Sequence, residues 1–268
     1  MSQICFVTPK DTLNYDNNSS LQYRWGHDLL EKTKHLFRDG VSVLDVGCGN
    51  GKITQEILKL NNNIESIDGI DGSKPQIELA TKNNKSESKI KFIEMNLNEI
   101  NYVNRYDIVY GCCIFHWIAD QKSVFVKLFN SLKNDGIFMF VGPAANEFNI
   151  SIISEKIARS DKWKEDFVGF NSGRSYHTPE EYNNMLTQIG FEVQEIKETN
   201  TKNVYDDVEK LKNWIRPLAI YAKSLPGNDK QEEFIDDIVV EMFNQKLEME
   251  EGKIVMNSIK VEVLCRKI

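Results

Sequence analysis

Apolar and polar residues follow two different periods along this chain. Short apolar runs, typical of buried strands, are separated by stretches in which apolar residues recur every three or four positions, as on one face of a helix. This alternation predicts an α/β fold with a doubly wound, mostly parallel sheet. The expected strands span residues 41–46, 64–71, 89–95, 106–111, 137–141, 191–197 and 254–265, and the expected helices span residues 21–37, 52–60, 73–83, 120–132, 179–188, 208–223 and 231–245.

The clearest unit of this pattern is the stretch from Val41 to Gly51, VSVLDVGCGNG. An apolar run leads into a turn through Gly47, Gly49 and Gly51, and an amphipathic helix follows at once. Glycines allow positive φ angles and let a ligand approach the backbone closely. Their G-x-G-x-G spacing is neither the dinucleotide fingerprint nor a phosphate-binding P-loop, so a pyrophosphate ligand is not favoured. A glycine-rich turn without any ligand is the alternative.

Two acidic residues end the first two expected strands. Asp45, beside the turn, would repel a phosphate but attract a cationic group such as an α-ammonium. Asp71 follows Gly51 by 20 residues and lies at the edge where open parallel sheets bind ligands, so it is placed to accept two ribose hydroxyls. Asp68, inside the strand, is the competing candidate, and a solvated turn carboxylate is the alternative for Asp71.

Composition narrows the class of protein. The chain has 268 residues, of which 41% are hydrophobic, and this is enough for one large α/β domain. A net charge of −7 without a long basic block argues against a nucleic-acid partner. Five cysteines without a C-x-x-C pair, with Cys112 and Cys113 adjacent, and four scattered histidines indicate neither disulfides nor a metal site. Without a signal peptide or a membrane span, we expect a cytoplasmic protein, with a monomer favoured and the oligomeric state left open.

The ordered motifs together resemble the core of class I S-adenosylmethionine (AdoMet) methyltransferases. This resemblance covers about residues 40–142 and rests on the segments 43–51, 69–71, 95–97, 106–109 and 132–140. Within that superfamily the chain is similar to the small-acid carboxyl O-methyltransferases, which include the trans-aconitate and juvenile-hormone-acid enzymes. The stretches that carry this closer similarity are Tyr15 with Ser20-Leu21-Gln22, 116–120 (HWIAD), 158–163 (ARSDKW) and 176–179 (YHTP).

The resemblance implies AdoMet as the cofactor and S-adenosylhomocysteine (AdoHcy) as its product. Asn96 departs from the family pattern, because many relatives have an acid there that faces the adenine amino group. Asn96 can still accept a hydrogen bond through its carbonyl or donate one to a ring nitrogen. The cofactor-binding residues that the resemblance implies are Tyr15, Asp45, Gly47, Cys48, Gly49, Asp71, Gly72, Gln76, Asn96, Leu97 and Cys112.

The resemblance also implies methyl transfer to a small-molecule carboxylate, which gives a methyl ester. A carboxylate, with a pKa of about 4, is ionised at neutral pH and needs positioning but no base. Gln22 and Trp117, whose family equivalents flank the acid, are uncharged donors that can aim one oxygen at the methyl group. A solvated helix face and core packing are the alternatives for these two residues.

Other acceptors stay open. His116 would be the base if the acceptor were a hydroxyl or an amine, although a lone histidine beside a tryptophan is more often structural. A carrier-bound malonyl group is a variant of the carboxylate hypothesis. A non-enzymatic AdoMet-binding protein is a further alternative.

We expect a single methyltransferase domain over residues 1–268, with a Rossmann-like sheet and an antiparallel edge strand. A separate second domain is not expected, because core strands interrupt the segments outside the core. The expected parts are a core over about residues 40–142, 178–199 and 253–268, a helical cap over the cofactor from residues 144–176 and 200–252, and an N-terminal segment, 1–38, that covers the cofactor.

Overall fold

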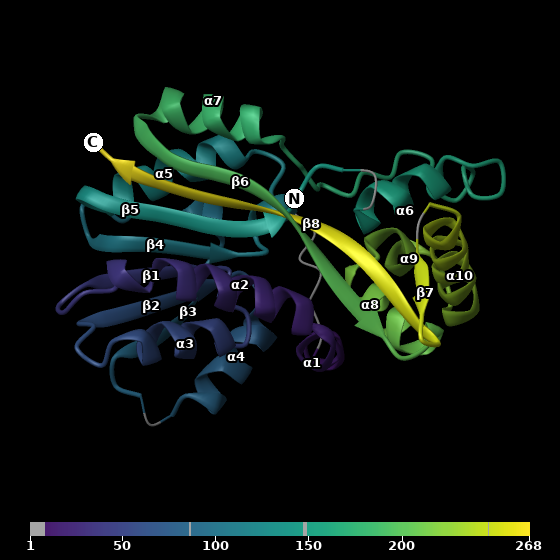
Figure 1. Cartoon of the computed structure of the whole chain (residues 1–268), viewed down its shortest axis with the longest axis horizontal. Coiled ribbons are helices and arrows are strands. Elements are labelled where there is room, and N and C mark those ends of the chain that lie inside the picture. Colours follow the sequence, from purple (N-terminus) through teal and green to yellow (C-terminus); the bar gives the residue numbers. More distant parts are fainter. Residues whose placement is uncertain (1–8, 86, 147–148, 246) are drawn as a thin grey trace.

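The computed structural model describes residues 9–85, 87–146, 149–245 and 247–268. These residues form one sheet of eight strands with helices on both faces and a helical cap at one end (Figure 1). The strand order is β3-β2-β1-β4-β5-β8-β6, and β7 pairs with β8 outside this path. The strands are β1 (Ser42–Val46), β2 (Ser66–Asp71), β3 (Ile90–Glu94), β4 (Tyr106–Cys112), β5 (Leu132–Pro143), β6 (Phe191–Tyr205), β7 (Glu248–Glu250) and β8 (Lys253–Lys267).

The sheet confirms the doubly wound fold. Strands β1 to β5 pair in parallel, and the order reverses between β1 and β4. The expected antiparallel strand is β8, which lies between β5 and the outermost strand β6 and runs antiparallel to both. The final two long strands, β8 and β6, thus lie at one edge of the sheet.

Alternating side chains bury both faces of the sheet. Val43 and Met139 point to the face that is covered by α2 and α3, while Leu44, Phe138 and Phe140 point to the face that is covered by α5 and α7. All five side chains are almost completely buried, as expected for central strands between two helical layers. The helices are α1 (Pro9–Asn18), α2 (Ser20–Thr33), α3 (Lys52–Leu60), α4 (Lys74–Asn83), α5 (Gln121–Ser131), α6 (Ile150–Ala158), α7 (Pro179–Ile189), α8 (Val208–Leu218), α9 (Ile220–Ser224) and α10 (Asn228–Gln245), with short 3₁₀ turns η1 (Lys34–Leu36), η2 (Leu97–Glu99) and η3 (Phe115–Trp117).

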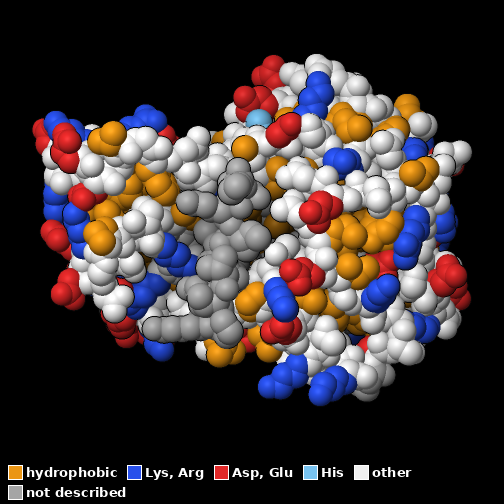
Figure 2. Space-filling model, turned by 180° about the vertical axis from the view of Figure 1, so that it is seen from behind, with side chains coloured by type: hydrophobic (Ala, Val, Ile, Leu, Met, Phe, Trp, Pro, Cys, Tyr) orange, Lys and Arg blue, Asp and Glu red, His pale blue; other side chains and the backbone are white. Residues whose placement is uncertain are grey.

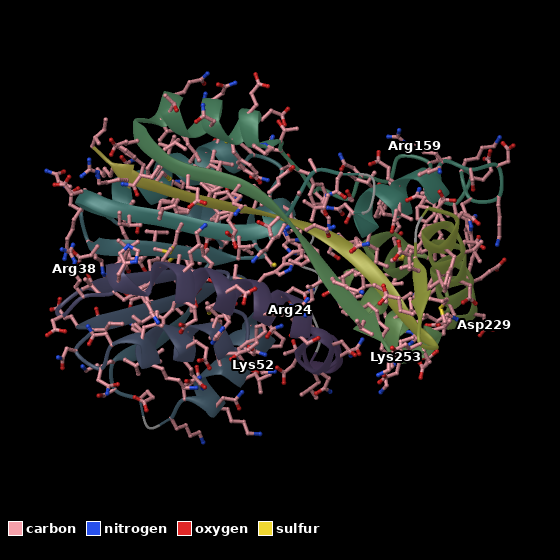
Figure 3. The ribbon with its side chains drawn as sticks, viewed as in Figure 1. Arg24, Arg38, Lys52, Arg159, Asp229 and Lys253 are labelled. Carbon is pink, nitrogen blue, oxygen red and sulfur yellow. The ribbon has the colours of Figure 1, made fainter. Side chains whose placement is uncertain are left out.

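Helix α1 is absent from the sequence-based expectation, in which the first helix begins at residue 21. Its one large aliphatic residue, Leu13, is 53% exposed, so the helix has no apolar stripe to reveal it. Polar contacts hold it instead: the Asp16 carboxylate accepts a hydrogen bond from Asn50 and pairs with Lys52 (Figure 3). Residues 1–8 of the expected N-terminal segment lie outside the described residues.

Strand β6 is much longer than the expected strand over residues 191–197. It pairs with β8 from Phe191 to Tyr205, and its second half runs past β5 as a two-stranded ribbon that reaches the cap (Figure 1). Polar side chains in this half of the strand form hydrogen bonds with α2. The Trp25 indole donates to Thr201 Oγ1 at 3.0 Å, and Arg24, which is labelled in Figure 3, donates to Asn203. The expected cap segment 200–252 therefore begins with the end of a strand, and it also contains β7.

The cap consists of α6, α8, α9 and α10 and shares one continuous core with α2. Trp163, which is 2% exposed, packs edge to face on Phe234 at a ring distance of 5.1 Å. Basic and acidic side chains are interspersed on the face that Figure 2 shows. In the described part of the chain, no helix has both the length and the apolar character needed to cross a bilayer.

Candidate functional site

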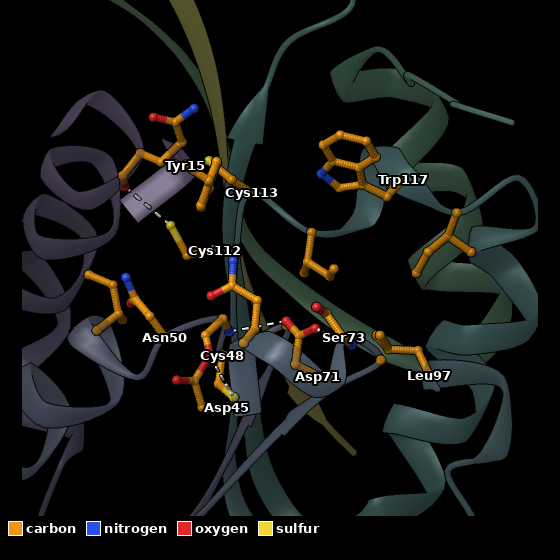
Figure 4. A pocket seen from close by; sticks show the side chains of 18 of the residues that line it. Tyr15, Asp45, Cys48, Asn50, Asp71, Ser73, Leu97, Cys112, Cys113 and Trp117 are labelled. Atoms are coloured by element: carbon orange, nitrogen blue, oxygen red, sulfur yellow. Dashed lines mark hydrogen bonds between the residues drawn. The ribbon is translucent and has the colours of Figure 1, made fainter. Parts of the chain in front are cut away.

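A cavity of about 410 Å³, the outer cavity, opens at the carboxyl ends of β1, β2 and β4. This position is the point where the strand order reverses, the usual ligand site of open α/β sheets. The turn after β1, the end of β2, the residues after β3 and β4, and helix α1 all line it (Figure 4). The structure brings together here all eleven residues for which the resemblance implies cofactor binding, from Tyr15 to Cys112.

The glycine turn has two kinds of glycine. A Cβ added to Gly47, whose φ is 71°, would lie 2.5 Å from Ile114, so the protein's own packing requires glycine there. A Cβ on Gly49, whose φ is 53°, would meet nothing closer than the Gln76 side chain at 3.9 Å. Because the space next to Gly49 belongs to the cavity, its missing side chain leaves room for a ligand against the backbone.

Asp71 lies at the end of β2 with both carboxylate oxygens directed to backbone donors. The Gly49 N–H donates to Oδ2 at 3.1 Å and the Ser73 N–H to Oδ1 at 2.8 Å (Figure 4). Burial nevertheless raises the pKa of Asp71 above its ordinary value. Each oxygen keeps a lone pair for a further donor.

Asp68, the competing residue, does not line the outer cavity. Its Oδ2 accepts hydrogen bonds from Arg105 at 2.6 Å and from the Tyr106 hydroxyl at 2.7 Å. These two partners give Asp68 a structural role within the sheet. The geometry therefore favours Asp71 over Asp68 as the ligand-binding acid.

Asp45 ends β1 beneath the turn and is 1% exposed. The Thr54 hydroxyl donates to its Oδ2 at 2.7 Å. Burial raises the pKa of Asp45 to about 7, against the opposing effect of that hydrogen bond and with a smaller contribution from the charge of Asp71. A cation in the cavity would favour its ionised form.

The wall of the outer cavity also offers neutral polar groups, beside the charged side chains of Lys52 and Asp120. Gln76 is 2% exposed, and its Oε1 has no hydrogen-bond partner in the described structure. Asn96 caps η2, and its Oδ1 accepts the Asn98 N–H at 3.0 Å, so its amide NH₂ is the group left to face a ligand. The Cys112 thiol donates to the backbone carbonyl of Gln22 at 3.3 Å. A hydrogen bond with Cys113, together with burial, raises the pKa of Cys112, which keeps it protonated.

A second cavity of about 70 Å³, the inner cavity, adjoins the first beneath the cap. Helix α2, turn η3, α6, α8, β8 and the segment 174–176 enclose it. Four residues line both cavities, and they define the junction between them: Tyr15, Gln22, Cys113 and Trp117. The structure thus places both of the expected acceptor-binding donors, Gln22 and Trp117, where the two cavities meet.

His116 lines only the inner cavity. It is 8% exposed, its ring stacks on Tyr176 at 5.6 Å, and its Nδ1 has no partner among the described residues. Burial, and to a smaller extent the charge of Arg174, lowers the pKa of His116 well below 6.5. This histidine is therefore neutral at neutral pH and a weak base.

Sequence reasoning gave no site role to Arg174 or Tyr176, which lie in the wall of the inner cavity, although Tyr176 belongs to the family-like stretch 176–179. Arg174 lies in the polar stretch NSGRSYH, where no periodicity separates a binding residue from a solvated loop. In the structure its guanidinium carbon lies 3.7 Å from the centroid of the Trp117 ring. The Tyr176 hydroxyl donates to Ser151 Oγ at 2.8 Å, and this bond joins the segment to α6.

Comparison with known proteins places this site in a family. The methyltransferase domain family matches residues 37–201. Juvenile hormone acid O-methyltransferase of Drosophila melanogaster is 25% identical over 257 residues, which cover 88% of this chain and 84% of that protein. A malonyl-[acyl-carrier protein] O-methyltransferase of Halalkalibacterium halodurans is 30% identical over 134 residues, which cover 47% of this chain and about half, 49%, of that protein.

A solved structure shows the same fold. The crystal structure of the YcgJ protein from Bacillus subtilis superimposes with a TM-score of 0.64 at 18% identity, over 90% of this chain and 97% of that one. The sequence match covers the glycine turn, the second acid and the residues that line the outer cavity after β3 and β4. The chain belongs to the methyltransferase domain family.

Proposed function

We propose that this methyltransferase transfers a methyl group from AdoMet to one oxygen of a small-molecule carboxylate, which gives a methyl ester and AdoHcy. The two adjoining cavities support this assignment, because a methyl donor and an acceptor must meet in line at one point. The Drosophila relative, named for the methylation of an acid, adds support over most of the chain.

The outer cavity fits AdoMet by its own donor and acceptor set. Asp71 offers two oxygens to the ribose hydroxyls, and Asp45 offers negative charge to the ammonium group. The unpaired buried oxygen of Gln76 and the amide NH₂ of Asn96 have the polarity to bind the cofactor's remaining polar groups, the NH₂ as a donor to an adenine ring nitrogen. When bound, AdoMet supplies a methyl group that its positively charged sulfur has already activated.

The junction between the cavities carries the acceptor assignment. Of its four residues, Gln22 and Trp117 are neutral donors, and burial raises the pKa of Tyr15, so that it stays protonated. An acceptor that must lose a proton finds no strong base there, whereas a carboxylate is already ionised. Gln22 and Trp117 would orient the acceptor at the point where the two cavities meet.

The alternatives make different demands on the same site. A hydroxyl or amine acceptor would depend on His116, whose lowered pKa makes it a poor base near neutral pH. A malonyl group on a carrier protein also presents a carboxylate, and the Halalkalibacterium relative is named for that acceptor. We also propose a cytoplasmic location, and we favour a monomer while leaving the oligomeric state open.

Product chemistry tests the proposal. The protein is incubated with methyl-labelled AdoMet and a panel of free acids, alcohols, amines and malonyl-carrier protein. Label that mild alkali releases as methanol identifies an ester and supports a carboxylate acceptor. Alkali-stable label would contradict it and indicate an ether or a methylamine. Binding of AdoHcy without transfer to any member of the panel would instead favour a binding protein.

A further inference from the structure

Unpaired polar atoms gather around the inner cavity. Among the described residues, nine buried side-chain nitrogen or oxygen atoms have no hydrogen-bond partner. Buried polar groups are normally satisfied, and each one left unpaired costs about 1–3 kcal/mol. Their concentration around one small cavity indicates that a polar ligand completes them. Four of the nine belong to residues of the inner cavity: Gln22 Oε1, His116 Nδ1, Arg174 Nε and Trp214 Nε1.

Arg174 is the one permanently charged side chain among the described residues that line the inner cavity. Its Nη2 donates to the Leu218 carbonyl at 2.8 Å and its Nη1 donates to the Ser151 hydroxyl, so both terminal nitrogens bind neutral oxygens. No described acid forms an ion pair with it. A half-buried guanidinium without a counter-anion is unfavourable, and an anion in the cavity would offset that cost.

The orientation of Arg174 is fixed from two sides. The guanidinium carbon lies over the Trp117 ring at 3.7 Å from its centroid, and the bonds to Ser151 and Leu218 hold the two terminal nitrogens. The buried Nε–H is the donor that stays unpaired. Its charge also acts on the cavity, because Arg174 contributes to the lowered pKa of His116.

We propose that Arg174 selects an anionic acceptor: its Nε–H binds a carboxylate oxygen of the acid in the inner cavity. This inference rests on the proposed methyl transfer and adds the residue that separates an acid from its neutral analogues. Gln22 and Trp117 orient the oxygen that reacts, and Arg174 holds the group as an anion beside them. A neutral analogue leaves the guanidinium charge without a counter-anion, which is why the site rejects it.

The test pairs acids with neutral analogues. Acetate, butyrate, octanoate and decanoate, each with its primary amide, are titrated into AdoHcy-saturated protein by calorimetry. The wild-type protein should bind at least one acid about 10- to 100-fold more tightly than its amide. Arg174→Gln should lose this preference, and Arg174→Lys should keep part of it, because lysine retains the charge without the planar fork. Arg159→Gln is the matched control, since Arg159 is exposed on the outside of the cap and pairs with Glu155 (Figure 3).

The affinity for AdoHcy should stay unchanged in Arg174→Gln, because Arg174 does not line the outer cavity. Equal binding of acids and amides by the wild-type protein, or an undiminished preference in Arg174→Gln, overturns the inference. If Arg174→Gln does not fold, Arg174→Lys decides: a reduced preference supports the role of Nε–H and a full preference contradicts it. Acids that bind with the expected preference but yield no ester would refute methyl transfer and leave Arg174 as an acid-binding residue.

Discussion

The outer and inner cavities differ in charge and in origin. Three acids, Asp45, Asp71 and Asp120, and one base, Lys52, line the outer cavity, whereas the guanidinium of Arg174 lies in the inner one. A cavity with carboxylates suits a cationic methyl donor, and a cavity with a buried cation suits an anionic acceptor. The positively charged methyl donor and the negatively charged acceptor that we propose thus meet at the junction, where Gln22 and Trp117 lie.

The largest expected effect is the loss of cofactor binding in the outer cavity, while the inner cavity keeps its structure. Gly49→Val places a branched side chain in the outer cavity at a φ of 53°. We expect AdoHcy, which should bind the wild-type protein with a Kd on the order of micromolar, to show no binding in calorimetry. Gly40→Val is the control, because Gly40 has a similar φ of 73° with no atom near its Cβ and does not line either cavity. Binding that survives in Gly49→Val would refute the outer cavity as the cofactor site.

A smaller loss of AdoHcy affinity should distinguish Asp71 from Asp68, the two acids of β2. Asp71→Asn removes the charge that we expect to accept the ribose hydroxyls, so AdoHcy should bind about 2–3 kcal/mol more weakly. Asp68→Asn should lower thermal stability, since it weakens the contacts to Arg105 and Tyr106, and should leave AdoHcy affinity intact. The reverse ranking in calorimetry would show that Asp68 is the ligand-binding acid.

A substitution at the junction should lower the turnover number kcat. Trp117→Phe keeps an aromatic ring beneath Arg174 and loses only the indole N–H. If that group orients the acceptor, kcat should fall about 10- to 100-fold, or roughly 1.4–3 kcal/mol at the transition state. The affinity for AdoHcy should change little. An unchanged kcat would mean that Trp117 serves packing alone.

The smallest effect is a pH dependence of the outer cavity. The pKa of Asp45 is about 7 in the folded protein, above its unfolded value of about 4, so the neutral form is favoured by folding. The stability of the ligand-free protein should therefore fall as pH rises from about 4 through 7. The ammonium group of AdoHcy, placed beside Asp45, favours the ionised form, so AdoHcy should bind up to about tenfold more tightly at pH 8 than at pH 6.

Calorimetry and thermal melts at the two pH values test this sign. Asp45→Asn removes the titrating group without changing its size, so its affinity and its melting temperature should lose this dependence. A pH profile that Asp45→Asn leaves unchanged would assign the titration to another group.

The two cavities also differ in how far the sequence predicts them. Most of the outer cavity comes from segments that run in order along the core, and Asp45 and Asp71 lie at strand ends that apolar runs predict. The inner cavity combines α2, η3, β8 and the cap, which are far apart in the sequence. Arg174 stands in a polar stretch without periodicity, so only the fold shows that its side chain is half-buried beside Trp117.

The same physical reason explains why two elements were not predicted from the sequence. Helix α1 and the second half of β6 are held mainly by polar contacts, such as those of Asp16 and Asn203, and not by an apolar stripe. Hydrophobic periodicity indicates which faces are apolar and buried, and it does not detect such polar contacts. The central strands β1, β2 and β4, whose side chains are mostly buried on both faces, begin and end within two residues of the predicted bounds.

The structure of a ternary complex tests the central claim most directly. Crystals are grown with AdoHcy and the acid that binds most tightly in the acid–amide series. We predict AdoHcy in the outer cavity with its ribose on Asp71, and the acid in the inner cavity with its carboxylate against Arg174 and one oxygen facing the sulfur of AdoHcy between Gln22 and Trp117. An acid bound away from this junction, or with its carboxylate turned from the sulfur, would contradict the account.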